Sequence, residues 1–75
     1  MRTSQAELLQ EKGVYALVNT INNKMYIGST IMSFSKRCNH HVNRLRNNKH
    51  KNQHLQNAFN KYGEDNFKIV VLEMD

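Results

Sequence analysis

Four side chains in this 75-residue chain are suited to chemistry on an anionic group: the phenols of Tyr15 and Tyr26 and the imidazole of His41 for proton transfer, and the guanidinium of Arg37 for binding the anion. A guanidinium pairs with two anionic oxygens at once, and an imidazole gains or loses a proton near neutral pH. A phenol acts as a base at that pH only with help from an adjacent cation or a metal. These types become a site only if the fold brings them together.

Residues 13–28 predict two short antiparallel strands that would gather the tyrosines. Apolar residues alternate along the first strand, the polar pair Asn22-Asn23 marks the turn, and Met25-Tyr26-Ile27 follow. The start of one hairpin strand lies beside the end of the other, so both phenols are expected at one end of the sheet. Gly28 is predicted to end the second strand, either with a positive φ or where another backbone or a phosphate comes close.

A loop over residues 29–33 should lead into a helix capped by Ser33 or Ser35, on which Arg37 and His41 lie one turn apart at the border of core and surface. Its buried stripe is expected to be Phe34, Cys38, Val42 and Leu45. A second helix is predicted from Asn52 to Tyr62, ended by Gly63. The apolar run 67–72 predicts a third strand in the centre of the sheet. The order is β-β-α-α-β, an α+β fold preceded by an N-terminal arm over residues 1–11, in which Ser4 can cap a short helix.

Charge is unevenly distributed along the chain. The formal net charge is +5, yet no carboxylate occurs between Lys12 and Gly63, a span that holds nine of the eleven lysines and arginines and all four histidines. Such a surface is typical of proteins that bind a nucleic-acid backbone, and the alternative is a solvated basic face. The residues expected to contact phosphates are Lys24, Lys36, His40, Arg44, Arg46, Lys49, His50 and Lys51.

The single cysteine, Cys38, cannot form an internal disulfide and fits a reducing compartment. No apolar run approaches the roughly 20 residues of a membrane helix, and no signal peptide is evident. We expect no membrane association and a cytoplasmic location. A zinc site built from Cys38, His50 and His54 is disfavoured, because Cys38 belongs to the apolar stripe and no second cysteine exists.

The motif Gly13-Val14-Tyr15 followed by Tyr26-Ile27-Gly28 resembles the pair that names the GIY-YIG nuclease family, with valine for one isoleucine. Members of the family also place an arginine near the start of the first helix and a histidine or tyrosine four residues later, as Arg37 and His41 are placed here. Residues 55–63 and 67–73 are similar to the second helix and third strand of phage homing endonucleases in the family. The resemblance spans residues 13–73.

The resemblance implies metal-dependent hydrolysis of DNA phosphodiester bonds by a nuclease domain over residues 12–75, with Gly13 and Gly28 as motif glycines. It implies that Tyr15 and Tyr26 position or deprotonate the attacking water, that Arg37 neutralises charge on the scissile phosphate, and that His41 assists proton transfer. Without the resemblance, the tyrosines can be ordinary cross-strand aromatics, Arg37 an exposed cation, and His41 a solvent-facing residue with His40 as its competitor.

One family feature has no counterpart in this chain. A glutamate on a helix after the third strand binds Mg²⁺ or Mn²⁺ in the family, and this sequence stops at Asp75. We therefore expect a C-terminally truncated domain that lacks this helix and the metal ligand, and that can be inactive as it stands. The alternative is a non-catalytic nucleic-acid-binding module that retains the nuclease fold. A homodimer, or a separate DNA-binding domain in a longer parent protein, is the expected source of any missing contacts.

Overall fold

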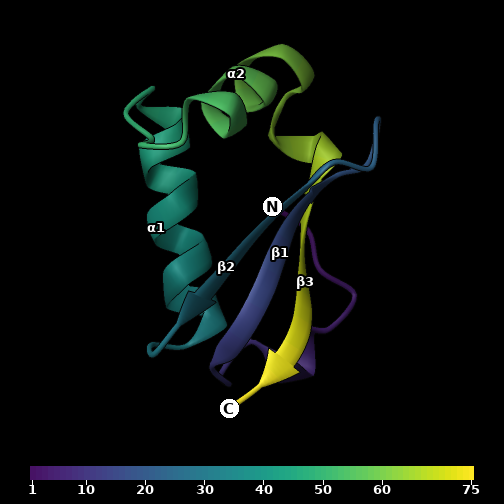
Figure 1. Cartoon of the computed structure of the whole chain (residues 1–75), viewed down its shortest axis with the longest axis vertical. Coiled ribbons are helices and arrows are strands. Elements are labelled where there is room, and N and C mark those ends of the chain that lie inside the picture. Colours follow the sequence, from purple (N-terminus) through teal and green to yellow (C-terminus); the bar gives the residue numbers. More distant parts are fainter.

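A three-stranded antiparallel sheet forms the centre of the structure, a computed structural model that describes residues 1–75. Its strands β1 (Gly13–Asn19), β2 (Met25–Thr30) and β3 (Phe67–Met74) lie in the order β2-β1-β3. Helices α1 (Phe34–Arg46) and α2 (Gln53–Tyr62) connect β2 to β3, and short 3-10 turns occupy Ala6–Leu8 and Glu64–Asn66. The predicted α+β class and the β-β-α-α-β order are confirmed (Figure 1).

Local signals in the sequence define both helices. Ser33 caps α1, because its Oγ accepts a hydrogen bond from the Lys36 N–H at 3.2 Å. Asn52 caps α2 in the same way, accepting from the Leu55 N–H at 3.1 Å. Gly63 ends α2 with a φ of 85°, a conformation that side chains disfavour. These caps fix where each helix begins and therefore which residues face the sheet.

The hydrophobic core lies between the helices and one face of the sheet. Side chains at alternate positions of β1 and β3 pack against α1 and α2, and the nine fully packed members are Tyr15, Leu17, Phe34, Leu45, Leu55, Phe59, Phe67, Ile69 and Val71. The opposite face of the sheet carries no helix, and Met25, Ile27 and Leu72 are exposed. The catalytic candidates are therefore expected on the helix side, where the sheet has a partner layer.

The central strand is β1, so the prediction that residues 67–72 form the central strand is wrong. Strand β1 is buried almost throughout, whereas Lys68 and Leu72 on the second face of β3 are exposed. Apolar residues on both faces of the strand indicated burial on both sides, but one face of β3 is open to solvent. The second strand also continues through Gly28 to Thr30, so the predicted loop over residues 29–33 begins later.

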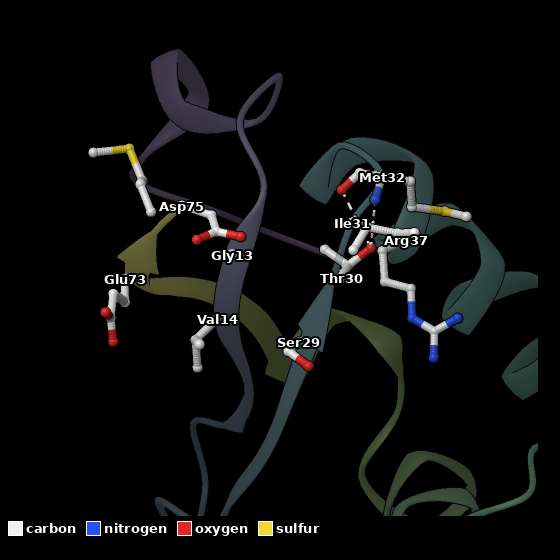
Figure 2. A pocket seen from close by; sticks show the side chains of 10 residues that line it. Gly13, Val14, Ser29, Thr30, Ile31, Met32, Arg37, Glu73 and Asp75 are labelled. Carbon is white, nitrogen blue, oxygen red and sulfur yellow. Dashed lines mark hydrogen bonds between the residues drawn. The ribbon is translucent and has the colours of Figure 1, made fainter.

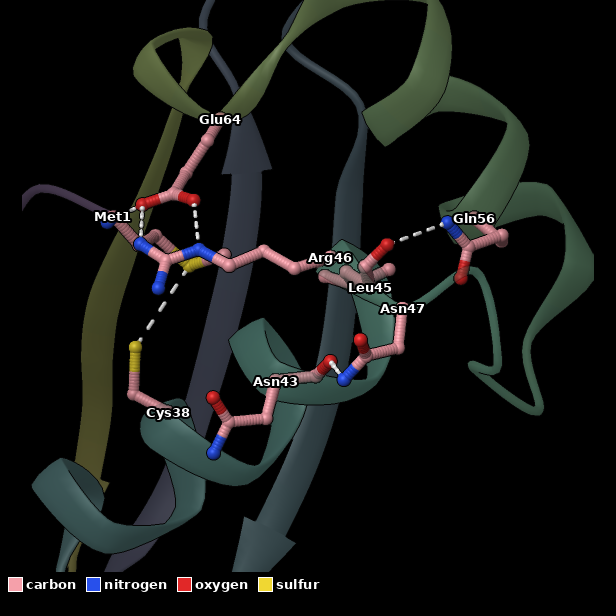
Figure 3. A network of polar contacts seen from close by, with 8 residues as sticks. All are labelled: Met1, Cys38, Asn43, Leu45, Arg46, Asn47, Gln56 and Glu64. Carbon is pink, nitrogen blue, oxygen red and sulfur yellow. Dashed lines mark hydrogen bonds and ion pairs between the residues drawn. The ribbon is translucent and has the colours of Figure 1, made fainter.

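The N-terminal arm pairs with the outer edge of β3. Arg2 forms a parallel bridge with Lys68, and the Gln5 side chain bonds both main-chain groups of Val71, at 2.8 Å to N and 3.3 Å to O. The predicted Ser4 cap is wrong, since Gln5 occupies that position and its side chain forms no capping bond. The Met1 ammonium lies 3.1 Å from a Glu64 carboxylate oxygen, which also binds Arg46 (Figure 3). The division into residues 1–11 and 12–75 stays a prediction.

None of the helices in the structure combines the length and apolar character needed to span a membrane.

Candidate active site

The hairpin brings Tyr15 and Tyr26 to one cavity. In the β1–β2 register Tyr15 pairs with Gly28, while Tyr26 pairs with Leu17, two residues further along the same face. Tyr15 is buried, with 2% of its surface exposed, and Tyr26 is half-buried. Both side chains line a cavity of about 170 Å³ between the sheet and the helices. The expectation that both phenols lie at one end of the sheet is wrong, because β2 continues to Thr30 and Tyr26 therefore lies near its start, beside the hairpin turn. The two side chains instead share one face of the sheet, two residues apart.

Gly28 makes room for the Tyr15 ring. A Cβ at this position would lie 2.7 Å from the Tyr15 hydroxyl oxygen, closer than real contacts of that kind occur. The residue has no positive φ and lies within β2 rather than at its end. The predicted positive φ is therefore wrong, and the group that comes close to Gly28 within the chain is the side chain of Tyr15 rather than another backbone. The close approach of a phosphate stays a prediction.

Helix α1 delivers Arg37 and His41 to the Tyr15 hydroxyl. The His41 Nε2 lies 2.6 Å from the hydroxyl oxygen, and the Arg37 Nε–H donates to the same oxygen at 3.4 Å. Their spacing of four residues aligns them on one side of the helix. His41 is buried rather than at the border of core and surface, with 8% of its surface exposed. His40, its sequence neighbour, is exposed to solvent and does not line this cavity.

His50 extends this cluster beyond the residues that the sequence singled out as catalytic. Its Nε2 lies 2.7 Å from the His41 Nδ1, and the two rings stack with 5.0 Å between centroids. The backbone N–H of His50 donates to the buried Gln56 Oε1 at 3.0 Å, and the backbone N–H of Asn52 donates to the His50 Nδ1 at 3.0 Å. The sequence signal for Gln56 was a polar residue between the buried Leu55 and Phe59 of α2.

Burial and neighbouring cations keep both imidazoles uncharged near neutral pH. The pKa of His41 is lowered from 6.5 to about 4, first by burial and then by the charge of Arg37. Burial, followed by the charge of Arg44, also lowers the pKa of His50. A neutral imidazole has one N–H donor and one acceptor nitrogen, so each ring can link two partners in a chain.

The catalytic candidates share the cavity, and two larger cavities adjoin it. Arg37 also lines a cavity of about 470 Å³ at the end of the sheet, and Tyr26 and Asn52 also line one of about 520 Å³ beneath the hairpin turn. The second of these carries Lys24, Lys61 and His54 and no carboxylate. An extended anionic chain can therefore lie across Tyr26 with cations beside it.

The residues expected to contact phosphates divide into two groups. Six of them are exposed and make no ion pair, namely Lys24, Lys36, His40, Arg44, Lys49 and Lys51. Arg46 is also exposed, but its Nε and Nη2 donate to Glu64 at 2.7 and 2.8 Å. His50 is partly buried within the hydrogen-bond network described above. Arg46 and His50 are consequently less available to a ligand than the other six.

The residues of the central cavity do not fit a hard divalent cation. Mg²⁺ and Mn²⁺ prefer oxygen ligands, and no carboxylate lines this cavity. The acids Glu73 and Asp75 lie on the β3 side of the neighbouring cavity, with Arg37 at its α1 side (Figure 2). No group of three or more His, Cys, Asp or Glu side chains is arranged to hold a metal ion. Cys38 contacts the Met1 sulfur rather than His50.

Comparison with known proteins assigns this arrangement to a family. The model of the GIY-YIG catalytic domain matches residues 11–75, which include both motif tyrosines, Arg37 and His41. The chain belongs to the GIY-YIG family. The resemblance of its motifs and the expected fold are thereby confirmed.

Two curated relatives of this GIY-YIG chain are named as endonucleases. One is "Probable intron-encoded endonuclease 1" of Neurospora crassa, 40% identical over 73 residues that cover 97% of this chain. The other is "Intron-associated endonuclease 1" of Enterobacteria phage T4, 40% identical over 63 residues that cover 84% of this chain. The chain spans only 22% and 25% of their respective lengths.

Solved GIY-YIG structures have the same fold. A mutant of the catalytic domain of intron endonuclease I-TevI superposes with a TM-score of 0.81 at 38% identity, covering 87% of this chain and 65% of that one. A second structure of the I-TevI catalytic domain gives a TM-score of 0.79, also at 38% identity, covering 84% of this chain and 66% of that one. The chain therefore contains the greater part of a GIY-YIG catalytic domain.

Proposed function

We propose that this chain is the phosphodiester-cleaving part of a DNA endonuclease. The observation that carries the proposal is the convergence of Tyr15, Tyr26, Arg37 and His41 on one cavity within an acid-free, basic surface. The endonuclease names of the relatives support it. Hydrolysis of a phosphodiester needs a positioned water, a route for its proton and a cation for the growing charge, and these residue types supply the three functions.

Arg37 is proposed to bind the scissile phosphate. Its Nε is engaged with the Tyr15 hydroxyl, while its two terminal nitrogens have no hydrogen-bond partner within the chain. Those nitrogens can hold two phosphate oxygens in a fork, and the bond through Nε fixes the plane of the guanidinium. A donor fixed in this way stabilises the charge that develops in the transition state, by about 3–4 kcal/mol at comparable sites.

The tyrosines are proposed to handle the attacking water, with His41 assisting through the Tyr15 hydroxyl. The Tyr15 hydroxyl is hydrogen-bonded to the His41 Nε2 and to the Arg37 Nε–H, and the buried ring has little freedom to move. Tyr26 faces both the central cavity and the lysine-lined cavity, so its hydroxyl can contact a water molecule or a flanking phosphate. Fixed groups of this kind accelerate attack by removing the need to order the reactants.

The DNA strand is proposed to run from the central cavity across Tyr26 toward Lys24 and Lys61. This path is bordered by the amide side chains of Asn22, Asn52 and Asn57 and holds no opposing acid. Lys36, Arg44, Lys49 and Lys51 add positive charge around it and are proposed to contact the backbone of the duplex.

Dependence on Mg²⁺ or Mn²⁺ is part of the proposal and rests on the family resemblance. Because the cavity residues do not fit such an ion, no catalytic step is assigned to it. Sequence specificity is proposed to come from a separate DNA-binding domain or a second copy of the chain, since the matched relatives are about four times as long. A DNA substrate and a lone cysteine also favour the interior of the host cell.

Nicking of supercoiled plasmid tests the proposal. The chain is incubated with plasmid and Mg²⁺ or Mn²⁺, beside Tyr15→Phe, Arg37→Ala and a metal-free reaction with chelator. We expect metal-dependent nicking that falls by about 10²–10³-fold in Arg37→Ala, while the affinity for DNA changes little. Nicking that is unaffected by both substitutions would show that another protein or another site cuts the plasmid.

The alternative function, a nucleic-acid-binding module without catalysis, gives a different result. Binding that weakens with rising salt, with no nicking under any metal, would favour this module for the 75-residue chain. The same assay on a longer parent protein then separates the two functions, because a catalytic Arg37 would still be required for cutting there.

A further inference from the structure

A continuous chain of hydrogen bonds runs from the start of α2 to the Tyr15 hydroxyl. It passes from the Asn52 N–H to the His50 Nδ1 at 3.0 Å, from the His50 Nε2 to the His41 Nδ1 at 2.7 Å, and from the His41 Nε2 to the Tyr15 oxygen at 2.6 Å. Each imidazole uses both ring nitrogens in this chain. The position of one proton therefore determines the positions of the others.

The first donor in the chain is unambiguous, because a backbone N–H can donate and cannot accept. The His50 Nδ1 must therefore be the acceptor nitrogen, and the neutral ring carries its proton on Nε2. That N–H donates to the His41 Nδ1, which places the His41 proton on Nε2 as well. His41 consequently donates to Tyr15. Burial and the nearby Arg37 and Arg44 keep both rings neutral, so each ring has a single N–H to donate.

This direction limits what the Tyr15 hydroxyl can offer a ligand. Its oxygen has two lone pairs, and both accept N–H donors, from His41 and from Arg37. Its own proton must then point elsewhere, and the open side of the group is the cavity that Tyr15 lines.

We propose that the Asn52 N–H sets a one-way hydrogen-bond chain, held in place by Gln56, so that Tyr15 exchanges its proton only with the cavity. The consequence for cleavage rests on the proposed function. In this exchange the Tyr15 hydroxyl first gives its proton to a solvent hydroxide ion in the cavity, which becomes water. The phenolate then accepts a proton from the attacking water molecule, which yields hydroxide and restores the phenol. His41 supports this exchange as a hydrogen-bond donor rather than as the base that deprotonates Tyr15.

Gln56 is the positioning residue of the chain. Only 2% of its surface is exposed, and its Oε1 accepts a hydrogen bond from the backbone N–H of His50 at 3.0 Å. Its Nε2 donates to the Leu45 carbonyl at 3.0 Å (Figure 3). A second bond joins the Gln56 Nε2 to Asn60 at 3.0 Å. One amide thus ties the His50 backbone to the end of α1 and to α2, which keeps His50 within reach of His41.

The test is a measurement of the imidazole tautomers by long-range ¹H–¹⁵N correlation on the ¹⁵N-labelled chain at pH 8. We expect both His41 and His50 to show a protonated Nε2 and an unprotonated Nδ1. A protonated Nδ1 on either ring would overturn the proposal. The spectrum needs no substrate, so its outcome is independent of whether the chain cuts DNA.

A matched pair of variants tests the role of the first donor. Asn52→Pro removes the N–H at a residue whose φ of −81° is close to the value that proline fixes, whereas Asn52→Ala removes the helix cap and keeps the N–H. We expect mixed tautomers at both histidines in Asn52→Pro and the original tautomers in Asn52→Ala. Original tautomers in a folded Asn52→Pro protein would contradict the proposal.

Gln56→Met, with the exposed Gln53→Met as its control, tests the positioning role. Gln56→Met is expected to mix the His50 tautomers and to slow nicking by roughly 10–100-fold. Loss of a residue that orients a metal ligand through a hydrogen bond has an effect of this size at metal centres. Gln53→Met should change neither. Unchanged tautomers in Gln56→Met would remove Gln56 from the proposal. Mixed tautomers with unchanged nicking would instead contradict the link between the chain of bonds and cleavage.

Discussion

Tyr15 and Gly28 are direct partners in the β1–β2 register, and the Tyr15 ring fills the space that a side chain at residue 28 would need. The hydroxyl oxygen and Cζ of Tyr15 would lie 2.7 and 2.8 Å from a Cβ on Gly28. The Tyr15 phenol can be held by His41 and Arg37 only while residue 28 has no side chain. Gly28 of the second family motif is thus needed for the position of Tyr15 in the first motif.

Gly28→Ala is therefore expected to slow nicking by about 10²-fold, because a displacement of the order of 1 Å at a reacting group has that effect. Single-turnover nicking is the measurement. The matched control is Ser29→Ala, an exposed neighbour on the same strand, which should retain the wild-type rate. A Gly28→Ala protein with the wild-type rate would mean that the position of the Tyr15 hydroxyl does not limit cleavage.

Lys24 and Lys61 are expected to contribute to DNA affinity rather than to the rate of the chemical step. Each change to Ala should reduce the slope of log K against log salt by about 0.9 for every phosphate of duplex DNA that the lysine had neutralised. Fluorescence anisotropy across a salt series measures this slope. Lys68→Ala is the control, because Lys68 is an exposed lysine on β3 that lines none of the cavities. An equal effect of Lys68→Ala would point to a diffuse charge effect.

The depressed pKa of His41 predicts how stability depends on pH. The folded value is about 4 and the ordinary value is 6.5, so the unfolded chain binds more protons between these limits. The stabilising contribution is present above pH 6.5 and is lost as the pH falls toward 4, by at most about 3 kcal/mol. Urea unfolding from pH 7 to pH 4 measures the loss. His41→Gln should weaken this pH dependence, whereas the exposed His40→Gln should leave it as in the wild type.

The lowered pKa of Glu64 predicts a second loss of stability, at lower pH. Hydrogen bonds from Arg46 lower the pKa of Glu64 from 4.5 to about 2, so the carboxylate stabilises the fold above pH 4.5, and this contribution is lost as the pH falls through 2. Glu64→Gln should lower the thermal midpoint at pH 7 and flatten its decline in this acid range. Asp65→Asn, a change at the exposed neighbouring acid, is the control. Equal acid sensitivity of Glu64→Gln and the wild type would show that the ion pairs with Arg46 and Met1 do not stabilise the fold.

Short-range patterns predicted most of the fold and the core of the site. The hairpin turn, the Ser33 cap and Gly63 are local features, and four-residue spacing is enough to place Arg37 beside His41. His50 and Gln56 could not be assigned to the site in the same way. Their contacts depend on how the loop around Asn48 folds α2 back onto α1, and no periodicity in the sequence records that angle. The central position of β1 likewise depends on strand pairing between distant segments.

The pairing of the N-terminal arm with β3 also bears on self-association through strand pairing. An edge strand with free N–H and C=O groups can recruit strands from other molecules and start fibre-like stacking. Gln5 occupies both main-chain groups of Val71, and Arg2 bonds Phe67 and Ile69. A segment that lines no cavity thus covers the main-chain groups of β3 along this edge. Proteolytic removal of the first five residues would consequently turn a discrete domain into one prone to self-assembly.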